Sequence, residues 1–447
     1  MRASILILAT LTSLVSAMGP NGPTQQVDSY LAPFIAGNNF SGCVLMARNA
    51  KPEISKCYGM ANVELKVPNS PTTRFHIASI SKPFTAAAVL QLEERGQLSV
   101  DNPLNRFFPG YPNGDRITLR NLLMHTSGIP NINDIPEYNQ LQPRHHTLDE
   151  LIAMFRDRTR EFPPGTKYAY SNSNYNLLAR VIELVSKQSY AQFLQENIFS
   201  PLRMADTGND DSAETIIPER APGYATVGAT GIGNAPFLDW SNKVGNGSLY
   251  TTTADLLKFM TAFADGKVVK KATLDRIWVE KPGNNFGWFV RKRFGKRVIA
   301  MNGRSPGFGS SMEYFPDDGV IVIVLSNLYI TTTNSPIAPD LAAMALDQPV
   351  TNSGPMQPIK LPWAKTKAYA GAYQFGADYF RPNQKLTVIP HDDGVDLDWG
   401  NGFHTEAFAV GDNDFILRTF WTHIIFRDGQ MIYKDDPREY VAKRIGD

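Results

Sequence analysis

The spacing of hydrophobic residues changes twice between residues 41 and 327. It is typical of strands at first, then of helices, and then of strands again. Residues 41–64 contain two stretches rich in Val, Ile and Tyr around a polar turn, which predicts a β-hairpin. Apolar positions at helical spacing follow in four segments, at residues 82–96, 147–158, 174–187 and 251–266. Strand-like runs return at residues 286–303 and 309–327. This order predicts an α/β domain whose sheet takes strands from both ends of the segment, with helices covering it.

The pattern changes again near residue 348. Residues 348–363 are rich in Pro, Gly and Asn, which is typical of a linker. Short strand-like runs follow, and in one of them Val395 and Leu397 alternate with Asp396 and Asp398. Alternation with a period of two predicts a half-buried strand. Residues 364–447 are therefore expected to form a small all-β barrel or sandwich.

The first 17 residues have the layout of a secretory signal peptide. Arg2 precedes the apolar run Ile5–Leu14, and the small residues Ser16 and Ala17 follow it. The apolar run is too short for a membrane anchor, which needs roughly 20 residues. We therefore expect cleavage after Ala17, a main domain over residues 18–347, and a secreted or periplasmic protein without a membrane span.

Composition and charge narrow the class of partner. The 447 residues carry 44 Lys and Arg against 43 Asp and Glu, so the net charge is +1. Such a balance gives no electrostatic footprint for nucleic acid, and a small-molecule or peptide substrate is expected instead. The only cysteines, Cys43 and Cys57, flank the turn of the predicted hairpin. They would lie opposite each other if the turn is centred near Ala50, and the sequence leaves their pairing open.

The stretch HIASISKPF, residues 76–84, is the first candidate for chemistry. Ser79 and Lys82 are three residues apart at a predicted helix start, so their side chains share a face. The partial positive charge and free amide protons of a helix start would stabilise an oxyanion and favour a neutral lysine. A neutral lysine could take the proton of the serine. An ordinary capped helix start explains the same letters, and the motif alone is weak.

A second motif strengthens the chemical interpretation. Tyr170 and Asn172 lie in a turn-rich loop directly before a predicted helix. A tyrosine beside a lysine is expected to lose its proton cheaply and to act as a base, and Asn172 could position a substrate amide. The segment Tyr111–Asn113 has the same spacing. It lies among Pro and Gly residues, so we interpret it as a structural turn.

Three further features receive structural interpretations. His125 invites a catalytic triad with Ser79, but Lys82 and Tyr170 already fill the role of the base, and we expect His125 to fix its loop. The pair His145 and His146 lacks a third ligand at metal-site spacing and is interpreted as a solvated loop. The glycine-rich residues 228–236 lack the lysine of a phosphate loop and are expected to form a flexible wall near the substrate. Neither a metal nor a cofactor is expected.

Five stretches of the chain resemble one family. They are HIASISKPFTAAAVLQLEERGQLSVD, LRNLLMHTSGIPN, FPPGTKYAYSNSNYNLLARVIE, NGSLYTTTADLLKF and RSPGFGSSMEYFPDDGVIVIVLSN. Together they resemble the serine β-lactamase-related hydrolases, which include class C β-lactamases, D-alanyl-D-alanine carboxypeptidases, D-aminopeptidases and esterases. The likeness runs from about residue 30 to 345. The C-terminal segment resembles the lipocalin-like β module that often follows such domains.

The resemblance implies a fold and a set of roles. The fold would be a β-lactamase/transpeptidase-like antiparallel sheet flanked by helices, with a helical subdomain. Ser79 would be the acylated nucleophile, Lys82 its proton partner and Tyr170 the general base, with Asn172 beside it. The oxyanion hole would combine the Ser79 amide with an amide of a later strand, the third motif.

This third motif departs from the family. The position of its usual Lys or His falls on Met301, followed by Asn302, Gly303 and Arg304. A methionine cannot hold a carboxylate, although Gly303 and the Arg304 amide could supply the backbone of the site. The Arg304 side chain is a candidate source of the missing charge. We expect an exported hydrolase of esters or amides, esterase or peptidase rather than efficient β-lactamase; the alternative is a non-catalytic binder on the same fold.

Overall fold

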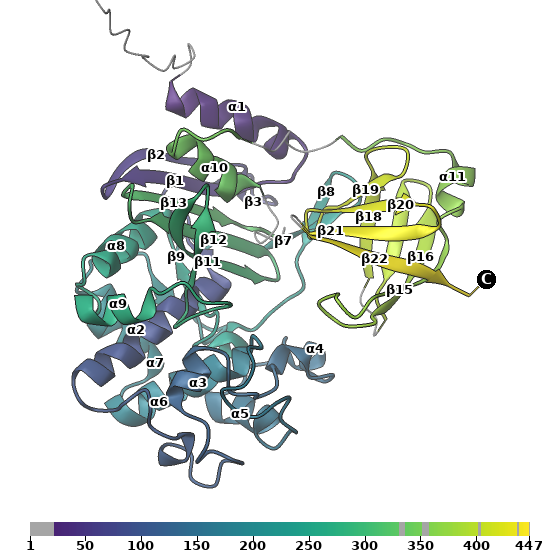
Figure 1. Cartoon of the computed structure of the whole chain (residues 1–447). Coiled ribbons are helices and arrows are strands. Elements are labelled where there is room, and N and C mark those ends of the chain that lie inside the picture. Colours follow the sequence, from purple (N-terminus) through teal and green to yellow (C-terminus); the bar gives the residue numbers. More distant parts are fainter. Residues whose placement is uncertain (1–21, 330–335, 351–356, 401–403, 436–437, 447) are drawn as a thin grey trace, which may run out of the picture.

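A computed structural model describes residues 22–329, 336–350, 357–400, 404–435 and 438–446. The predicted signal peptide lies outside these residues. Figure 1 shows a sheet with helices on its faces and, beside it, a separate β-barrel formed by the C-terminal part of the chain. The expected two-part architecture of an α/β fold followed by a small all-β fold is confirmed.

The main sheet takes its strands from both ends of its segment, as predicted. Its six strands are antiparallel and follow the order β10-β11-β12-β13-β1-β2. Their bounds are Gly42–Arg48 for β1, Lys51–Tyr58 for β2, Phe289–Arg293 for β10, Lys296–Ser305 for β11, Phe308–Phe315 for β12 and Val320–Ser326 for β13. All seven residues of β13 are buried, because helices cover both faces of the sheet.

Alternation along β11 assigns its residues to the two faces. Val298 and Ala300 belong to the core beneath α1 (Pro23–Ala36) and α10 (Ile337–Ala345). Ile299 and Met301 belong to the larger core on the other face, with α2 (Ser81–Glu94) and α8 (Thr253–Ala264). The period of two therefore places Met301 on the face that carries α2.

The helical subdomain joins the α2 side of the sheet (Figure 1). Its helices are α3 (Leu119–Leu123), α4 (Tyr138–Leu141), α5 (Leu148–Arg156), α6 (Asn172–Ser186), α7 (Tyr190–Leu194) and α9 (Lys271–Ile277). The shorter helical turns are η1 (Ala78–Ile80), η2 (Leu104–Arg106), η3 (Ile132–Asp134), η4 (Gln195–Phe199) and η5 (Trp240–Lys243). The four helical segments predicted from spacing correspond to α2, α5, α6 and α8.

Short strands form three small sheets around this frame. They are β3 (Met60–Asn62) with β4 (Val67–Pro68); β5 (Phe75–His76) and β6 (Gly208–Asn209) flanking β9 (Leu249–Thr251); and β7 (Tyr224–Val227) between β8 (Gly231–Asn234) and β14 (Leu328–Tyr329). The expectation of a flexible wall over residues 228–236 is wrong for Gly231–Asn234, because these residues pair with β7 as a hairpin.

The C-terminal barrel is closed and has eight strands. Its strands are β15 (Gly371–Phe375), β16 (Lys385–His391), β17 (Gly394–Asp398), β18 (His404–Ala409), β19 (Asp414–Leu417), β20 (Thr422–Arg427), β21 (Gln430–Asp435) and β22 (Arg438–Ile445), preceded by α11 (Trp363–Lys367). Val395 and Leu397 face its core, as the alternation predicts. Another of the strand-like runs in the sequence, residues 414–426, contains two strands, β19 and β20, separated by a turn.

The first hairpin settles the pairing of the cysteines. Cys43 and Cys57 are directly opposite residues of β1 and β2, and they form a disulfide. The turn between the strands is made by Asn49 and Ala50, both in the left-handed region with φ of 47° and 63°. The sequence left two registers open for this hairpin. The structure adopts the one in which the turn is centred near Ala50.

Candidate active site

Ser79 lies in the turn that leads into α2. The turn η1 covers Ala78–Ile80, and α2 begins at Ser81, so the predicted helix start near Ser79 is confirmed to within two residues. Ala78 has a φ of 46°, which is unusual for a residue other than glycine. Two hydrogen bonds hold Ile77 on the other side: its amide donates to Leu249 O at 2.9 Å, and its carbonyl accepts from Ser310 Oγ at 2.8 Å. The turn is thus fixed by β9 and β12.

Lys82 lies fully buried beside Ser79. Its Nζ is 3.0 Å from Ser79 Oγ, 2.8 Å from Asn172 Oδ1 and 2.7 Å from Asn246 O. Burial, and then the charge of Lys243, holds the pKa of Lys82 well below its usual value. A neutral amine has two N–H donors for the oxygens of Asn172 and Asn246. Its lone pair is then left for the hydroxyl of Ser79.

Tyr170 contacts the same oxygen from the other side. Its hydroxyl donates to Ser79 Oγ at 2.9 Å, and its ring centroid is 4.9 Å from Lys82 Nζ. Burial raises the pKa of Tyr170 above its usual value. The expectation that Tyr170 ionises cheaply is therefore wrong, because a buried phenolate would lack solvation and the neighbouring lysine is itself driven toward its neutral form. The geometry suits a neutral phenol that donates a proton.

His125 supports Tyr170. Its ring stacks on the Tyr170 ring with centroids 4.4 Å apart, and its Nδ1 accepts from the amide of Ser171 at 3.0 Å. Burial, and then the charge of Lys82, holds the pKa of His125 well below its usual value. The structure therefore places His125 behind Tyr170, and the hydrogen bonds of Ser79 run to Lys82 and Tyr170.

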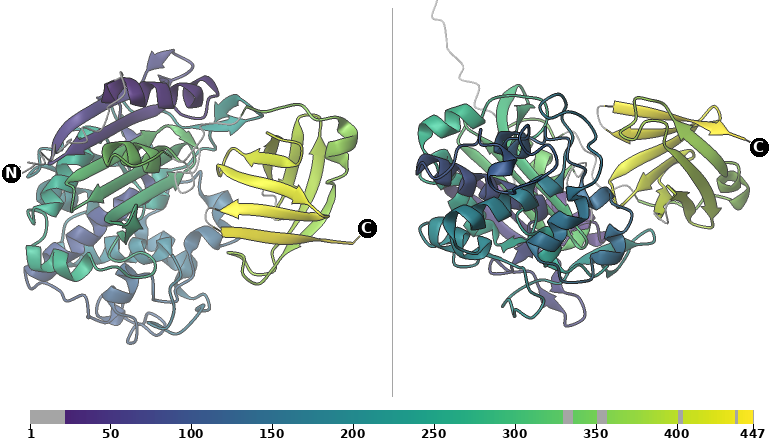
Figure 2. Two further views of the ribbon diagram at one scale, coloured as in Figure 1. Left: turned by 45° about the horizontal axis from the view of Figure 1, so that its top comes forward. Right: turned by 90° about the horizontal axis from the view of Figure 1, so that it is seen from below.

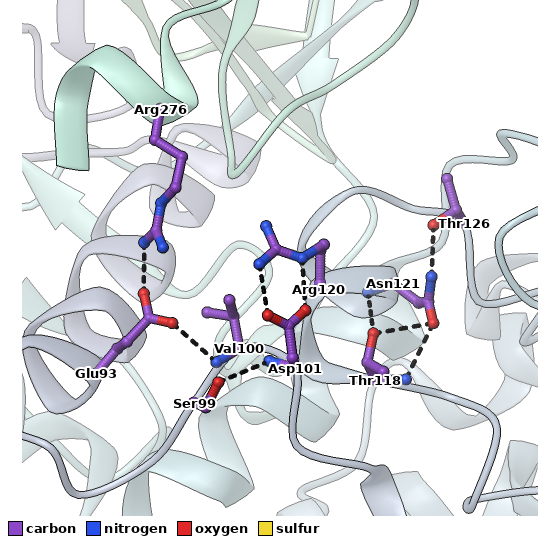
Figure 3. A network of polar contacts seen from close by, with 9 residues as sticks. All are labelled: Glu93, Ser99, Val100, Asp101, Thr118, Arg120, Asn121, Thr126 and Arg276. Carbon is purple, nitrogen blue, oxygen red and sulfur yellow. Dashed lines mark hydrogen bonds and ion pairs between the residues drawn. The ribbon is translucent and has the colours of Figure 1, made fainter. Parts of the chain in front are cut away.

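Figure 3 shows polar contacts at the far end of α2 and at the cap of α3, close to His125 in the sequence. Glu93, near the end of α2, accepts from the amide of Val100 at 3.0 Å and pairs with Arg276. At the cap of α3, Asn121 Nδ2 donates to Thr126 Oγ1 at 3.2 Å. These contacts fix the chain just after α2 and the residue that follows His125.

The strand β11 lies directly against Ser79. A Cβ atom on Gly303 would be 2.1 Å from Ile77 O and 3.0 Å from Ser79 N, so only glycine allows this approach. A cavity of about 230 Å³ opens here. It brings together all the residues proposed from the sequence except the buried Lys82, and its lining is Ser79, Tyr170, Asn172, Phe289, Met301, Asn302, Gly303 and Arg304.

Met301 and Arg304 differ in their surroundings. Met301 is 1% exposed, and its sulfur is 3.5 Å from Asn284 Nδ2. The guanidinium of Arg304 lies over two aromatic rings, 4.5 Å from the centroid of Tyr329 and 4.3 Å from that of Phe420. Phe420 belongs to the barrel.

Sequence reasoning missed Phe289, Asn246 and Phe420 at this site. Asn246 contributes only its backbone carbonyl, which its residue type does not signal. Phe420 reaches the site only through the placement of the barrel.

The remaining sequence candidates lie elsewhere. Tyr111 is buried beside a turn in which Asn113 has a φ of 51°, as a structural role requires. The side chain of His145 is 57% exposed, and His146 Nδ1 is 3.1 Å from Asn242 Oδ1. Within the described part of the chain, no group of three or more His, Cys, Asp or Glu residues could hold a metal ion.

A family model described as Beta-lactamase matches residues 27–346. The chain belongs to this beta-lactamase family. Among its relatives is the putative penicillin-binding protein PbpX of Bacillus subtilis, 32% identical over 305 residues that cover 68% of this chain and 74% of that protein. Penicillin-binding protein 4* of the same organism is 30% identical over 443 residues, covering 91% and 95% of the two chains. The beta-lactamase family assignment confirms the resemblance seen in the five stretches.

A solved structure of the same fold extends this similarity over the barrel. The octameric penicillin-binding protein homologue from Pyrococcus abyssi aligns with a TM-score of 0.65 and 22% identity, covering 94% of this chain and 99% of that one. The beta-lactamase fold followed by a β-barrel is therefore shared with that homologue. In the described residues, every helix falls short of the length and apolarity that a membrane span requires.

Proposed function

We propose that the protein is an exported serine hydrolase that cleaves an ester or amide through an acyl-enzyme on Ser79. The observation that carries the proposal is the position of Ser79 Oγ, which is 3.0 Å from Lys82 Nζ and 2.9 Å from the Tyr170 hydroxyl. A nucleophile and a proton donor therefore line the cavity, and a base lies buried beside the nucleophile. Export rests on the signal-peptide pattern of residues 1–17.

In the first half-reaction, neutral Lys82 takes the proton of Ser79 as Oγ attacks the substrate carbonyl carbon. The new C–O bond pushes the carbonyl electron pair onto its oxygen, and the amides of Ser79 and Arg304 would hold that charge. When the tetrahedral intermediate collapses, the bond to the leaving group breaks. Tyr170 donates its proton to the leaving group and recovers one from the lysine ammonium.

In the second half-reaction, water attacks the ester formed on Ser79. One water proton passes to the Lys82 and Tyr170 pair, and the other stays on the new carboxylic acid product. Collapse of the second intermediate releases that acid and returns the proton to Ser79 Oγ. The cycle regenerates all three side chains and requires no other reactant.

The methionine at position 301 bears on which substrates are expected to react well. Methionine offers no charge at the position where the family usually has Lys or His, so β-lactams that depend on that charge should react slowly. We expect kcat/KM for p-nitrophenyl butyrate to exceed that for nitrocefin. Turnover of nitrocefin at an equal or greater rate would contradict this order.

Covalent labelling tests the proposal. A fluorophosphonate should add to the protein once, with the added mass located by peptide mapping on Ser79. Ser79→Ala should abolish the label, whereas Ser200→Ala, a change to an exposed serine, should keep it. An intact mass unchanged by the fluorophosphonate and by a labelled penicillin would favour the alternative of a non-catalytic binder.

A further inference from the structure

A second cavity, of about 340 Å³, lies beside the cavity of Ser79. Arg304 of β11 lines the first cavity, and Pro306 and Phe308, at the turn that follows, line the second. Residues two apart on a strand are separated by roughly 7 Å, so the two cavities are neighbours along β11. His76, which precedes the turn of Ser79, also lines the second cavity.

The wall of the second cavity is mainly apolar and aromatic. The ring of Trp240 stacks on that of His76 with centroids 3.7 Å apart, and Phe308 meets the His76 ring edge-on at 5.0 Å. Phe237, which also lines the cavity, is 65% exposed. An exposed aromatic ring beside an apolar cavity is typical of a binding site for an apolar group.

The charged groups on this wall are engaged within the wall itself. His76 Nε2 is 2.8 Å from Asp210 Oδ2, and Arg220 Nη1 donates to the same oxygen at 3.1 Å. Asp239 caps η5, where its Oδ1 accepts from the amide of Ser241 at 3.0 Å. Burial lowers the pKa of His76, which favours its neutral ring. The cavity is therefore suited to a neutral, apolar ligand.

The hairpin β7–β8 forms one side of this cavity. Gly223 directly precedes β7, Asn234 ends β8 and Ala235 follows it, and all three line the cavity. A Cβ atom on Gly223 would be 2.7 Å from the Cα of Gly307, which belongs to the turn between β11 and β12. The amide of Ala235 donates to Gly223 O at 3.2 Å. The base of the hairpin therefore lies against the end of the strand that lines the first cavity.

The barrel holds the other end of the hairpin, which lies between the main sheet and the barrel in Figure 2. Arg418, in the turn between β19 and β20, donates to the carbonyls of Gly228 and Gly231. It also donates to the carbonyl of Asn38, just after α1. Glu406 of β18 accepts from the amide of Gly228 at 3.0 Å. Arg418 is only 3% exposed, and a buried guanidinium without its partners would be costly, so this contact fixes the hairpin on the barrel.

We propose that the barrel determines which acyl groups the hydrolase accepts. The second cavity receives an apolar acyl group, and Arg418 is the positioning residue that holds its wall through the hairpin. The inference rests on the proposed function and deepens it. Because Tyr170 donates to the leaving group, the leaving group lies on the side of Tyr170, and the acyl group extends along β11 toward Pro306. The substrate class is an ester or amide of an apolar acyl group longer than butyryl.

Three p-nitrophenyl esters test the cavity, because acetate, butyrate and octanoate share a leaving group and differ only in the acyl chain. We expect kcat/KM of the wild type to rise by about 100-fold from acetate to octanoate, since each buried methylene strengthens binding in the transition state. Ala235→Phe fills the cavity and should lower the octanoate-to-acetate ratio by about 10-fold. The matched control is Ala191→Phe, a half-buried alanine of α7 that lines neither cavity and should leave the ratio unchanged.

The barrel has its own readout. Arg418→Met removes the contacts to the hairpin and should lower the same ratio by about 2- to 30-fold, chiefly through KM for octanoate. Arg418→Lys keeps a donor for the carbonyls and should retain part of the ratio. Glu406→Ala, a milder change at an exposed residue, should move the ratio in the same direction by less. Arg427→Met, at an exposed arginine of β20, is the control.

Thermal unfolding checks that each barrel variant is folded. A purely structural role of Arg418 would lower the rates for all three esters alike and leave the ratio unchanged.

A binding measurement separates this inference from the proposed function. Calorimetry with the Ser79→Ala variant gives the affinities for octanamide and acetamide without any turnover. Tighter binding of octanamide that is lost on adding Ala235→Phe and weakened on adding Arg418→Met supports the inference even if no fluorophosphonate labels Ser79. Equal affinities for the two amides, or a preference that either Ala235→Phe or the folded barrel variants leave unchanged, would overturn it.

Discussion

The two walls of the cavity are built in different ways. On one wall, Ser79 and Lys82 are three residues apart and fixed by a single turn of helix, and Tyr170 completes a contact shell of about 3 Å around one oxygen. On the other wall, β11 supplies a backbone edge and the side chain of Arg304. The guanidinium of Arg304 lies over the rings of Tyr329 in β14 and Phe420 in the barrel. The first wall holds the groups that carry out the reaction, whereas the second wall holds groups that can determine which substrate binds.

The largest expected effect comes from breaking the first wall. Lys82→Met should lower kcat by about 10³- to 10⁴-fold, because it removes the group that takes the proton of Ser79. The measurement is kcat for p-nitrophenyl butyrate, with thermal unfolding as the check on folding. A variant that stays folded and keeps more than a tenth of the activity would show that Lys82 is not the base.

The second wall should be most sensitive to a change in the backbone of β11 at Gly303. Gly303→Ala places a Cβ 2.1 Å from Ile77 O, so β11 must move away from Ser79. We expect a fall in kcat of about 10²-fold, comparable to the loss of one oxyanion donor. Gly295→Ala, in the turn before the same strand, is the control for adding a methyl group without a clash, because a Cβ there has no neighbour within 4 Å although the φ of Gly295 is positive. Similar losses for both variants would remove the oxyanion explanation.

The pairing of Ser79 with Lys82 could be predicted from the sequence because its geometry is local, whereas the role of Tyr170 beside Ser79 was implied by the family resemblance. Ser79 and Lys82 share a helical face by their spacing alone, and the loop of Tyr170 and Asn172 is marked by the helix that follows it. The ionisation of Tyr170 could not be predicted, because it depends on burial, which a motif does not show. The same holds for Lys243, whose charge bears on Lys82 from a separate segment.

The second wall could be predicted only in part. The alignment of Met301 with the usual Lys or His follows from the family resemblance, whereas the need for glycine at Gly303 is seen only in the contacts of β11 with Ile77 and Ser79. The partner of Arg304 could not be predicted, because the apolar run at residues 414–426 suggests one continuous strand. The structure divides that run at Arg418–Trp421, where an arginine buried among backbone carbonyls turns the chain toward the hydrolase part. A contact of this kind depends on how two folds dock.

The smallest expected effect concerns the charge of Lys243, which lies behind the first wall. Lys243 is 5% exposed, and its positive charge disfavours the ammonium form of Lys82, which lowers the pKa of Lys82. Activity requires the neutral amine, so it should fall as the pH drops through the pKa of Lys82. Lys243→Met removes the charge, which should raise the pKa of Lys82 and move the acidic limb of kcat/KM to higher pH. The plateau above that limb should change little.

The control is Lys267→Met, which removes a lysine that is 68% exposed and paired with Asp265. Its acidic limb should coincide with that of the wild type, because an exposed and paired charge is screened by water and salt. An acidic limb that stays in place in Lys243→Met would mean that a group other than Lys82 governs it. Movement to lower pH would contradict the sign of the interaction, because loss of a neighbouring positive charge can only favour protonation of the amine. The direction in which the acidic limb of kcat/KM moves therefore decides whether the buried Lys243 lowers the pKa of Lys82.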